Sequence, residues 1–353
     1  MKKSALIFYL ALAGIAFYMA RLAFRVTPGS MVQDSVAPLN KIPVQRIVSL
    51  CKPLPIILLG LDAGDQRLVG VNPETKLAIE SNVLNHYFPR IRQLPGTVCS
   101  PAFVPNIEEL IKLKPDLILQ WTRLPETIAK MQSFGFNVVG IDYDGTEKND
   151  REIVQKLAIA TDRKARSDSM MLNRDSVFQM IHSLTGKIPE EKKPRVIFVF
   201  DYENLRIGGE KCYENFCMEL AGGRNMGRGL GLEHSVNIEQ VLEWNPEIIF
   251  IRGWRTKITP DNFYQNPILA EVNAVKNRRV FKMPVWASNE SELNWKFMAE
   301  IMHPELFAFS LREDIRNSYF WQYHIQINES DIDQVLFYKE NASSPFFTRF
   351  KQQ

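Results

Sequence analysis

The chain contains the same helix-to-strand unit twice. The first copy, PNIEELIKLKPDLIL, runs from Pro105 to Leu119, and the second, VNIEQVLEWNPEIIF, runs from Val236 to Phe250. Each begins with an Asn N-cap, and Glu109 or Gln240 stands where it would complete a capping box. Apolar residues then recur at helical spacing, a proline stops the helix, and an apolar run is typical of a short buried strand. Two matched units predict two similar α/β lobes.

A segment between the two lobes has the composition of uninterrupted helix. Asp150 to Thr185 contains neither glycine nor proline, and Thr161-Asp162 is the one place where it would break. The second half, from Arg163, would be roughly 33 Å long at 1.5 Å per residue. We therefore expect a stiff helical strut between the lobes.

Length, charge and motifs limit the classes of function that the chain could have. The chain has 353 residues, enough for two domains with full cores, and its net charge is +3. This charge gives no reason to expect a nucleic-acid partner. The sequence has no Walker A, GxSxG or HExxH motif, which weighs against the corresponding enzyme classes.

The N-terminus differs from the rest of the chain. Lys2 and Lys3 precede an uncharged apolar stretch from Ser4 to Ala20. This pattern predicts export through residues 1–26, as a signal peptide or as a retained signal anchor that contacts the membrane. Residues 27–43, which contain three prolines, are expected to be a linker.

Export would place the four cysteines in an oxidising compartment. Cys51 and Cys99 belong to the first lobe, and Cys212 and Cys217 to the second. Their spacing is compatible with two disulfides and equally with four buried thiols.

An ordered set of motifs resembles a known family. RIVSL, LLGLDAGDQRLVGV, the first repeat, LAGGRN, the second repeat and AVKNRRVFKMP follow one another between about Val44 and Phe307. Together they resemble the substrate-binding proteins of ABC importers for iron-siderophores, haem, cobalamin and related metal ligands. MHPELF and YHIQINESDIDQVL, nearer the C-terminus, are similar to the subgroup of haem-type and molybdate-type binders.

The resemblance implies a fold, a role and partners. The fold would be α/β: two Rossmann-like lobes with parallel-type sheets, bridged by one long α-helix, as in class III periplasmic binding proteins. The lobes would occupy residues 44–149 and 187–353, the second with C-terminal helices, and the interlobe helix residues 150–186. A periplasmic protein of this kind would capture a metal chelate or metal oxyanion, hold no intrinsic cofactor, and deliver its ligand to a permease dimer with its ATPase.

Ligands of open α/β sheets lie beyond the carboxyl ends of the strands, which selects the loops after each predicted strand. Aromatic and cationic side chains in these loops would suit a flat organic chelate with carboxylates, or an anionic complex. Each cation is more often simply solvated, and each tryptophan more often core. The candidate ligand-binding residues are Cys51, Lys52, Cys99, Phe103, Trp121, Tyr202, Arg206, Trp254, Arg255 and Trp286.

Tyr202 is also a candidate metal ligand, because a phenolate can bind ferric or haem iron. Glu108 and Glu239 occupy the same place in the two repeats. A carboxylate in a first helical turn interacts favourably with the helix dipole, which would be a purely local role. The resemblance implies instead that these two glutamates dock on the permease subunits. A membrane-anchored periplasmic enzyme or sensor on the same two-lobe scaffold is the alternative function.

Overall fold

The computed structural model describes residues 44–351 apart from residues 53, 63, 81, 254–256 and 286–287, and the side chain at 288. The predicted signal segment and linker, residues 1–43, lie outside the described residues. None of the described helices is long and apolar enough to cross a membrane.

The N-terminal lobe is built on a four-stranded parallel sheet in the order β2-β1-β3-β4. Its strands are β1 (Ile47–Ser49), β2 (Leu68–Val71), β3 (Leu117–Trp121) and β4 (Val138–Ile141). Its helices are α2 (Leu54–Asp62), α3 (Pro73–Glu80), α4 (Leu84–Tyr87), α5 (Arg90–Gln93), α6 (Ile107–Leu113) and α7 (Pro125–Ser133). Helix α2 is almost wholly apolar and correspondingly buried, so it belongs to the core rather than to the surface.

The C-terminal lobe has a sheet in the order β10-β9-β5-β6-β8, with β7 beside β5. Its strands are β5 (Arg195–Asp201), β6 (Arg206–Gly208), β7 (Arg224–Asn225), β8 (Glu233–Ser235), β9 (Ile248–Ile251) and β10 (Val280–Lys282). Its helices are α10 (Tyr213–Leu220), α11 (Ile238–Trp244), α12 (Pro260–Tyr264) and α13 (Asn273–Lys276). Short 3-10 turns lie at Glu190–Lys192 and Pro267–Leu269.

This second sheet is not purely parallel, which corrects one sequence expectation. Strand β6 pairs antiparallel with β5, and β8 pairs antiparallel with β6. The chain turns back directly after Asp201, through Leu205 in a left-handed conformation (φ 42°). Residues expected to form a ligand loop are therefore partly a β-hairpin.

The two repeats fold alike. Asn106 and Asn237 cap α6 and α11, each accepting the N–H three residues later, from Glu109 at 3.3 Å and from Gln240 at 2.9 Å. Both helices end in a left-handed residue before proline, which explains the shared stop. The predicted reciprocal half of the first capping box is absent, because the N–H of Asn106 donates to Val98.

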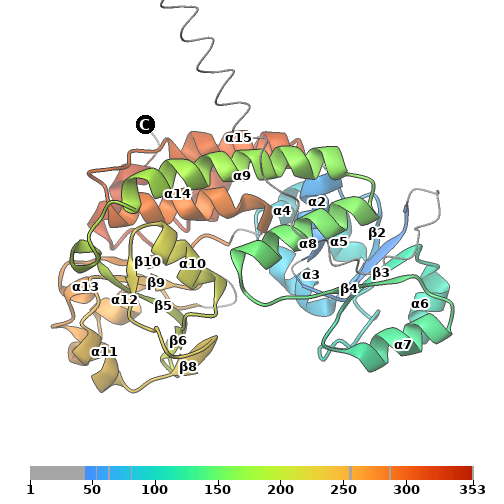
Figure 1. Ribbon diagram of the computed structural model, residues 1–353, viewed down its shortest axis with the longest axis horizontal. Helices are drawn as coiled ribbons and strands as arrows, with labels where there is room; N and C mark the ends of the chain where they lie inside the picture. Colours follow the sequence, from blue (N-terminus) through green and yellow to red (C-terminus); the bar gives the residue numbers. More distant parts are fainter. Residues whose placement is uncertain are drawn as a thin grey trace, which may run out of the picture. The chain divides into compact units, whose positions relative to one another are not determined.

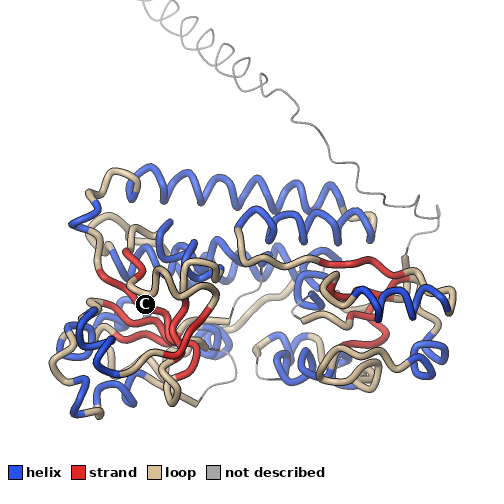
Figure 2. The backbone as a smooth tube through the Cα atoms, turned by 60° about the horizontal axis from the view of Figure 1, so that its bottom comes forward, coloured by secondary structure: helices blue, strands red, loops and turns tan. Residues whose placement is uncertain are grey.

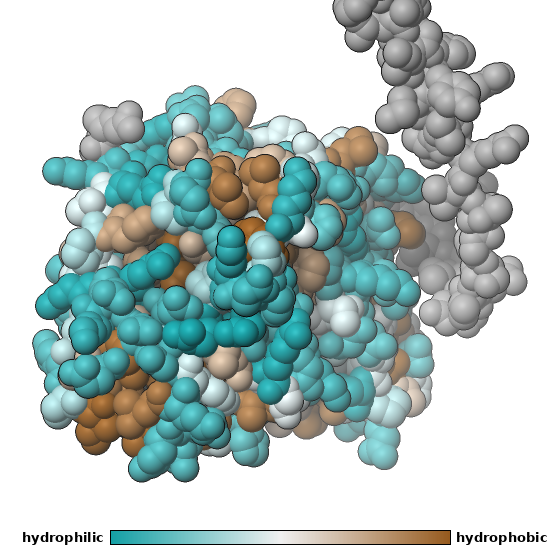
Figure 3. All heavy atoms as spheres, turned by 60° about the vertical axis from the view of Figure 1, so that its left-hand side comes forward, coloured by the Kyte–Doolittle hydropathy of each residue, from teal (hydrophilic) through white to brown (hydrophobic). Residues whose placement is uncertain are grey.

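Helices α8 (Glu147–Ala160) and α9 (Lys164–Thr185) form the predicted strut with its break between them. Figure 1 shows α9 running past both lobes, and Figure 2 shows the two sheets as separate groups of strands below it. Hydrophilic side chains cover most of the C-terminal-lobe face in Figure 3, so the apolar strands of that lobe lie inside.

The C-terminal segment adds a second connection between the lobes. It comprises α14 (Ser291–Met302), preceded by a turn at Ser288–Glu290, then α15 (Leu311–Tyr323), α16 (Glu329–Val335) and a turn at Pro345–Phe350. Arg166 of α9 donates to the carbonyl of Gly60 in α2 and to that of Gln322 in α15, both at 2.8 Å. Asp331 of α16 accepts from Tyr87 of the N-terminal lobe at 2.6 Å.

A candidate ligand cavity between the lobes

A cavity of about 440 Å³ lies between the two lobes, with walls from both. The N-terminal lobe contributes Lys52 after β1, Trp121 at the end of β3 and Tyr143 after β4. Phe198 and Phe200 of β5 and Arg252 after β9 form part of the opposite wall. Apart from Phe198, which lies in the middle of β5, these positions follow the rule that ligands lie beyond the carboxyl ends of strands. The remaining lining is mainly aliphatic: Leu54, Ile56, Ile57, Ala78, Ile153, Met283, Pro284, Val285 and Met298.

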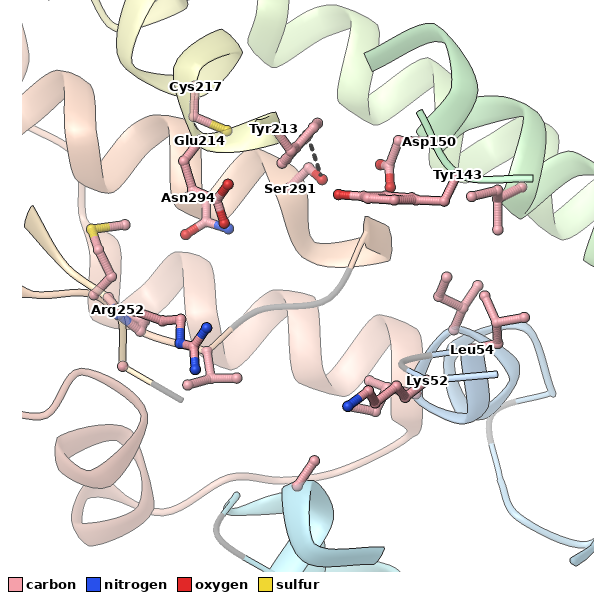
Figure 4. A pocket seen from close by; sticks show the side chains of 18 of the residues that line it. Lys52, Leu54, Tyr143, Asp150, Tyr213, Glu214, Cys217, Arg252, Ser291 and Asn294 are labelled. Carbon is pink, nitrogen blue, oxygen red and sulfur yellow. Dashed lines mark hydrogen bonds between the residues drawn. The ribbon is translucent and has the colours of Figure 1, made fainter. Parts of the chain in front are cut away.

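Two cationic side chains enter this apolar space from opposite lobes (Figure 4). The Nζ of Lys52 lies 3.5 Å from an oxygen of Glu74. The guanidinium of Arg252 lies 5.8 Å from the centre of the Phe200 ring. Burial lowers the pKa of Arg252, and the nearby charge of Arg206 lowers it further. Anionic groups of a ligand would stabilise the charged guanidinium of Arg252 and so oppose both effects on its pKa.

An aromatic and cationic cluster stands beside the N-terminal wall. Phe103 meets Trp121 edge to face, with ring centres 6.4 Å apart. The guanidinium of Arg123 lies 5.5 Å from the Phe103 ring and 5.7 Å from the Trp121 ring. The Nζ of Lys52 lies 6.0 Å from Phe103. Such cation–π contacts hold the positive groups near the cavity without neutralising them.

A buried polar network closes the cavity on the side of α9. The hydroxyl of Tyr213 accepts from Arg174 at 3.0 Å and is 2.9 Å from the hydroxyl of Ser291. Arg174 also pairs with Glu147, and with Asp150 at 2.7 Å. Tyr213, Ser291 and Asp150 all line the cavity, so the network joins the C-terminal-lobe side of its wall to both helices of the strut.

Some of the predicted site residues lie at the cavity and others lie away from it. Lys52 and Trp121 line the cavity, and Phe103 packs against Trp121. Tyr202 and Arg206 do not line it. The Tyr202 hydroxyl donates to the carbonyl of Asn262 at 3.0 Å and its ring packs on Phe263, whereas Arg206 lies 3.5 Å from Glu233. Trp254, Arg255 and Trp286 lie outside the described residues.

The four cysteines are buried free thiols. Burial raises the pKa of Cys99 to about 12 and raises those of Cys51, Cys212 and Cys217 as well. Neutral thiols at ordinary pH are poor metal ligands. Among the described residues, no group of three or more His, Cys, Asp or Glu side chains is arranged to hold a metal ion.

Several lining residues lay outside the sequence-based selection: Tyr143, Asp150, Tyr213, Glu214, Ser291 and Asn294. Applying the strand-end rule to the strand at Val138–Ile141 would have found Tyr143. The others are on helices α8, α10 and α14, which the rule does not cover.

Residues 101–285 match the family model described as Periplasmic binding protein. The chain belongs to the periplasmic binding protein family. This confirms the resemblance, and with it the two-lobed α/β fold and the role of substrate-binding protein for an ABC importer.

The relatives of this periplasmic binding protein are themselves substrate-binding proteins. The molybdate-binding protein MolA of Haemophilus influenzae is 23% identical over 343 residues, covering 88% of this chain and 95% of that protein. A vitamin B12-binding protein of Vibrio cholerae is 26% identical over 265 residues, covering 71% and 83%.

Solved structures agree with the fold. A periplasmic solute binding protein from Veillonella parvula has a TM-score of 0.77 at 25% identity, covering 86% of this chain and 94% of that one. Molybdate-bound MolA has a TM-score of 0.70 at 22% identity, covering 81% and 94%.

Proposed function

We propose that the protein captures an organic metal chelate with anionic groups in the cavity between its lobes. The observation that supports this most is the approach of Lys52 and Arg252 from opposite lobes into an otherwise mainly apolar space. Cavities of roughly 300–1,000 Å³ suit drug-sized organic ligands. A bare oxyanion would instead need many hydrogen-bond donors around a small volume, whereas aliphatic and aromatic side chains dominate these walls.

The relatives' names are compatible with this choice. They include binders of vitamin B12, of iron(3+)-hydroxamate and of Fe(3+)-citrate, beside molybdate-binding MolA. The cavity favours the organic chelates over molybdate. The absence of a metal-ligating cluster among the described residues is consistent with a metal that arrives already chelated.

The test has two steps. Native mass spectrometry and metal analysis of protein purified from its own periplasm should show a bound metal chelate. Calorimetry of Lys52→Met and Arg252→Met with that chelate should then show weaker binding, by about tenfold each, because charge-assisted contacts are lost. Lys112→Met, an exposed cation on α6, is the control. Tight binding of free molybdate and of no organic chelate would refute the proposal.

Delivery would use the two repeated helices. Glu108 and Glu239 are exposed in the first turns of α6 and α11, and neither forms an ion pair with any described residue. We propose that they dock on cationic groups of the two permease subunits. Glu108→Arg with Glu239→Arg should abolish uptake and permease binding while ligand affinity stays near wild type, because like charges would then face each other.

The control for docking is a second charge reversal of equal size elsewhere, Glu152→Arg with Glu190→Arg, on exposed positions of α8 and of the turn at 190–192. Uptake should survive it. Normal uptake by the Glu108/Glu239 double variant would leave only the local helix-dipole role.

Export completes the proposed function. The family is periplasmic, and the Lys2-Lys3 start followed by an apolar stretch supports an export signal. N-terminal sequencing of the protein from the periplasmic fraction and from the membrane fraction of the cell decides whether the signal segment is cleaved or retained as an anchor. A wholly cytoplasmic product would contradict the proposed role.

A further inference from the structure

Three polar side chains line the part of the cavity away from Lys52. Tyr143 reaches in from the N-terminal lobe, Glu214 from the first turn of α10, and Asn294 from α14 (Figure 4). We call these three residues the acceptor subsite. All three line the cavity, and their elements belong to both lobes.

The backbone explains why Tyr143 lies close to α10. Gly145, two residues further on, has φ +77° and touches the residue before the cap of that helix. A Cβ at Gly145 would lie 2.4 Å from the carbonyl oxygen of Lys211. The loop after β4 therefore packs directly on the backbone that leads into α10, and this contact carries Tyr143 towards Glu214.

Within the described protein, the carboxyl of Glu214 accepts from its own N–H and from the Cys212 thiol, which leaves further lone pairs of this carboxyl for a ligand. The Tyr143 hydroxyl and the Asn294 amide face the cavity, and the charge of Arg252 acts on the carboxyl of Glu214. The Cys212 thiol and its own N–H favour the charged carboxylate of Glu214, but burial is the larger effect and raises its pKa. Polar groups in an apolar cavity require hydrogen bonds from water or ligand.

The other carboxylate at the cavity, that of Asp150, has a different set of partners. Asp150 also lines the cavity, but it is tied to Arg174 at 2.7 Å. Glu214 therefore offers its acceptor oxygens to the cavity, whereas Asp150 is already bound on the strut side. Figure 4 shows Glu214 across the cavity from Lys52, whereas Arg252 comes from the same lobe as Glu214 and its charge acts on that carboxyl.

We propose that the acceptor subsite binds an ammonium group of the ligand, or a comparable N–H donor. The ligand would then be a metal chelate with two different ends: anionic groups near Lys52 and Arg252, and a cationic donor at Glu214. This inference rests on the proposed function and adds a second recognition element to it. Glu214 and Asn294 act as specificity-determining residues.

A matched pair of probes tests the subsite. Ferrioxamine B is a ferric trishydroxamate with a pendant ammonium, and its N-acetylated form keeps the same iron centre without that charge. Calorimetry should show that the wild-type protein prefers the ammonium form by about tenfold, the range of a hydrogen bond to a charged group. Glu214→Gln keeps the shape of the side chain and should remove the preference.

Two further variants separate this role from loss of structure. Asn294→Asp adds a carboxylate to the subsite and should increase the preference for the ammonium form. Glu219→Gln alters a carboxylate on the same helix that pairs with Arg228 at 2.5 Å, and should leave the preference unchanged. Circular dichroism before each titration verifies folding.

The outcomes distinguish this inference from the proposed function. Equal binding of the two probes by the wild-type protein, or an unchanged preference in Glu214→Gln, overturns the acceptor subsite. Binding of ferric citrate but of neither ferrioxamine, with equal ferric citrate affinity in the wild type and in Glu214→Gln, also overturns it and leaves the proposed function standing. Binding of neither ferrioxamine nor ferric citrate, with free molybdate bound, overturns both.

Discussion

Arg174, in the middle of the strut helix α9, donates to Asp150 of α8 at 2.7 Å while only 2% of its side chain is exposed. The same guanidinium reaches Glu147 and the hydroxyl of Tyr213, and it lies 5.2 Å from the Trp295 ring. One buried cation therefore holds carboxylates of α8 and side chains of the C-terminal lobe against α9.

Replacing this cation should be strongly destabilising. Arg174→Met leaves Glu147 and Asp150 without their buried partner, which typically costs about 3–5 kcal/mol. Urea denaturation measures the loss. Arg151→Met is the comparison, since Arg151 also pairs with Glu147, at 2.7 Å, but is more exposed. Equal losses in the two variants would show that burial of Arg174 adds nothing.

Glu292 should make stability depend on pH. Burial raises the pKa of this carboxyl to about 7, although Arg174 and Lys296 oppose the shift and Asp314 adds to it. The folded state therefore binds the proton more tightly than the unfolded state. The contribution of Glu292 to the free energy of unfolding is fully present below the pKa of an ordinary glutamate. This contribution is lost as the pH rises through about 7.

Glu292→Gln should remove this dependence. Between pH 4 and pH 8, the unfolding free energy of the wild type should fall by on the order of 3 kcal/mol more than that of the variant. Denaturation at a series of pH values gives both curves. Glu243→Gln, on the surface of α11, should follow the wild type. Parallel curves for Glu292→Gln and wild type would contradict the assignment.

The contact between the C-terminal segment and the N-terminal lobe should stabilise the folded protein through Asp331. Its carboxylate accepts from Tyr87 at 2.6 Å and lies 2.9 Å from Nδ1 of His86. Burial, followed by the hydrogen bond to Asp331, raises the pKa of Tyr87 to about 12. In a double-mutant cycle, Tyr87→Phe and Asp331→Asn should show a coupling of about 1 kcal/mol or more, as for a hydrogen bond to a charged group. Strict additivity would show that the contact is not energetically coupled.

The two caps offer a prediction about the repeats. Asn106→Ala and Asn237→Ala should each cost about 1 kcal/mol, since each removes an N-cap hydrogen bond. The sites are in different lobes, so the double variant should lose the sum. Thermal or urea unfolding is sufficient for the measurement. Replacing the exposed Lys112 of α6 by Ala, as a control, should cost less than either cap.

Patterns that are local in sequence predicted the fold well. The repeat, its caps and stops, and the strut with its break depend on neighbouring residues, and the structure has them where the sequence places them. The antiparallel strand β6 was missed, because a tight turn at Leu205 without glycine gives little local signal.

The cavity was harder to predict. Lys52 and Trp121 were found because a rule links strand ends to ligands. Glu214 and Asn294 enter the cavity only because α10 and α14 pack against the strut, a relationship between distant segments. Tyr202 satisfied the same strand-end rule but is held against α12 by Asn262. A position after a strand therefore makes a residue a candidate for the ligand site, and the packing around that residue decides whether its side chain lines the cavity.

The pairing of α2 with the C-terminal helix α15 has a consequence for biogenesis. Helix α2 is assembled from residues near the start of the described chain, yet α15 packs on it, and Arg166 ties Gly60 to Gln322. A nascent chain threaded through a membrane in order from its N-terminus would carry α2 across long before its partner arrives. The first lobe would then stay incompletely packed, and open to chaperones and proteases, until the last helices emerge.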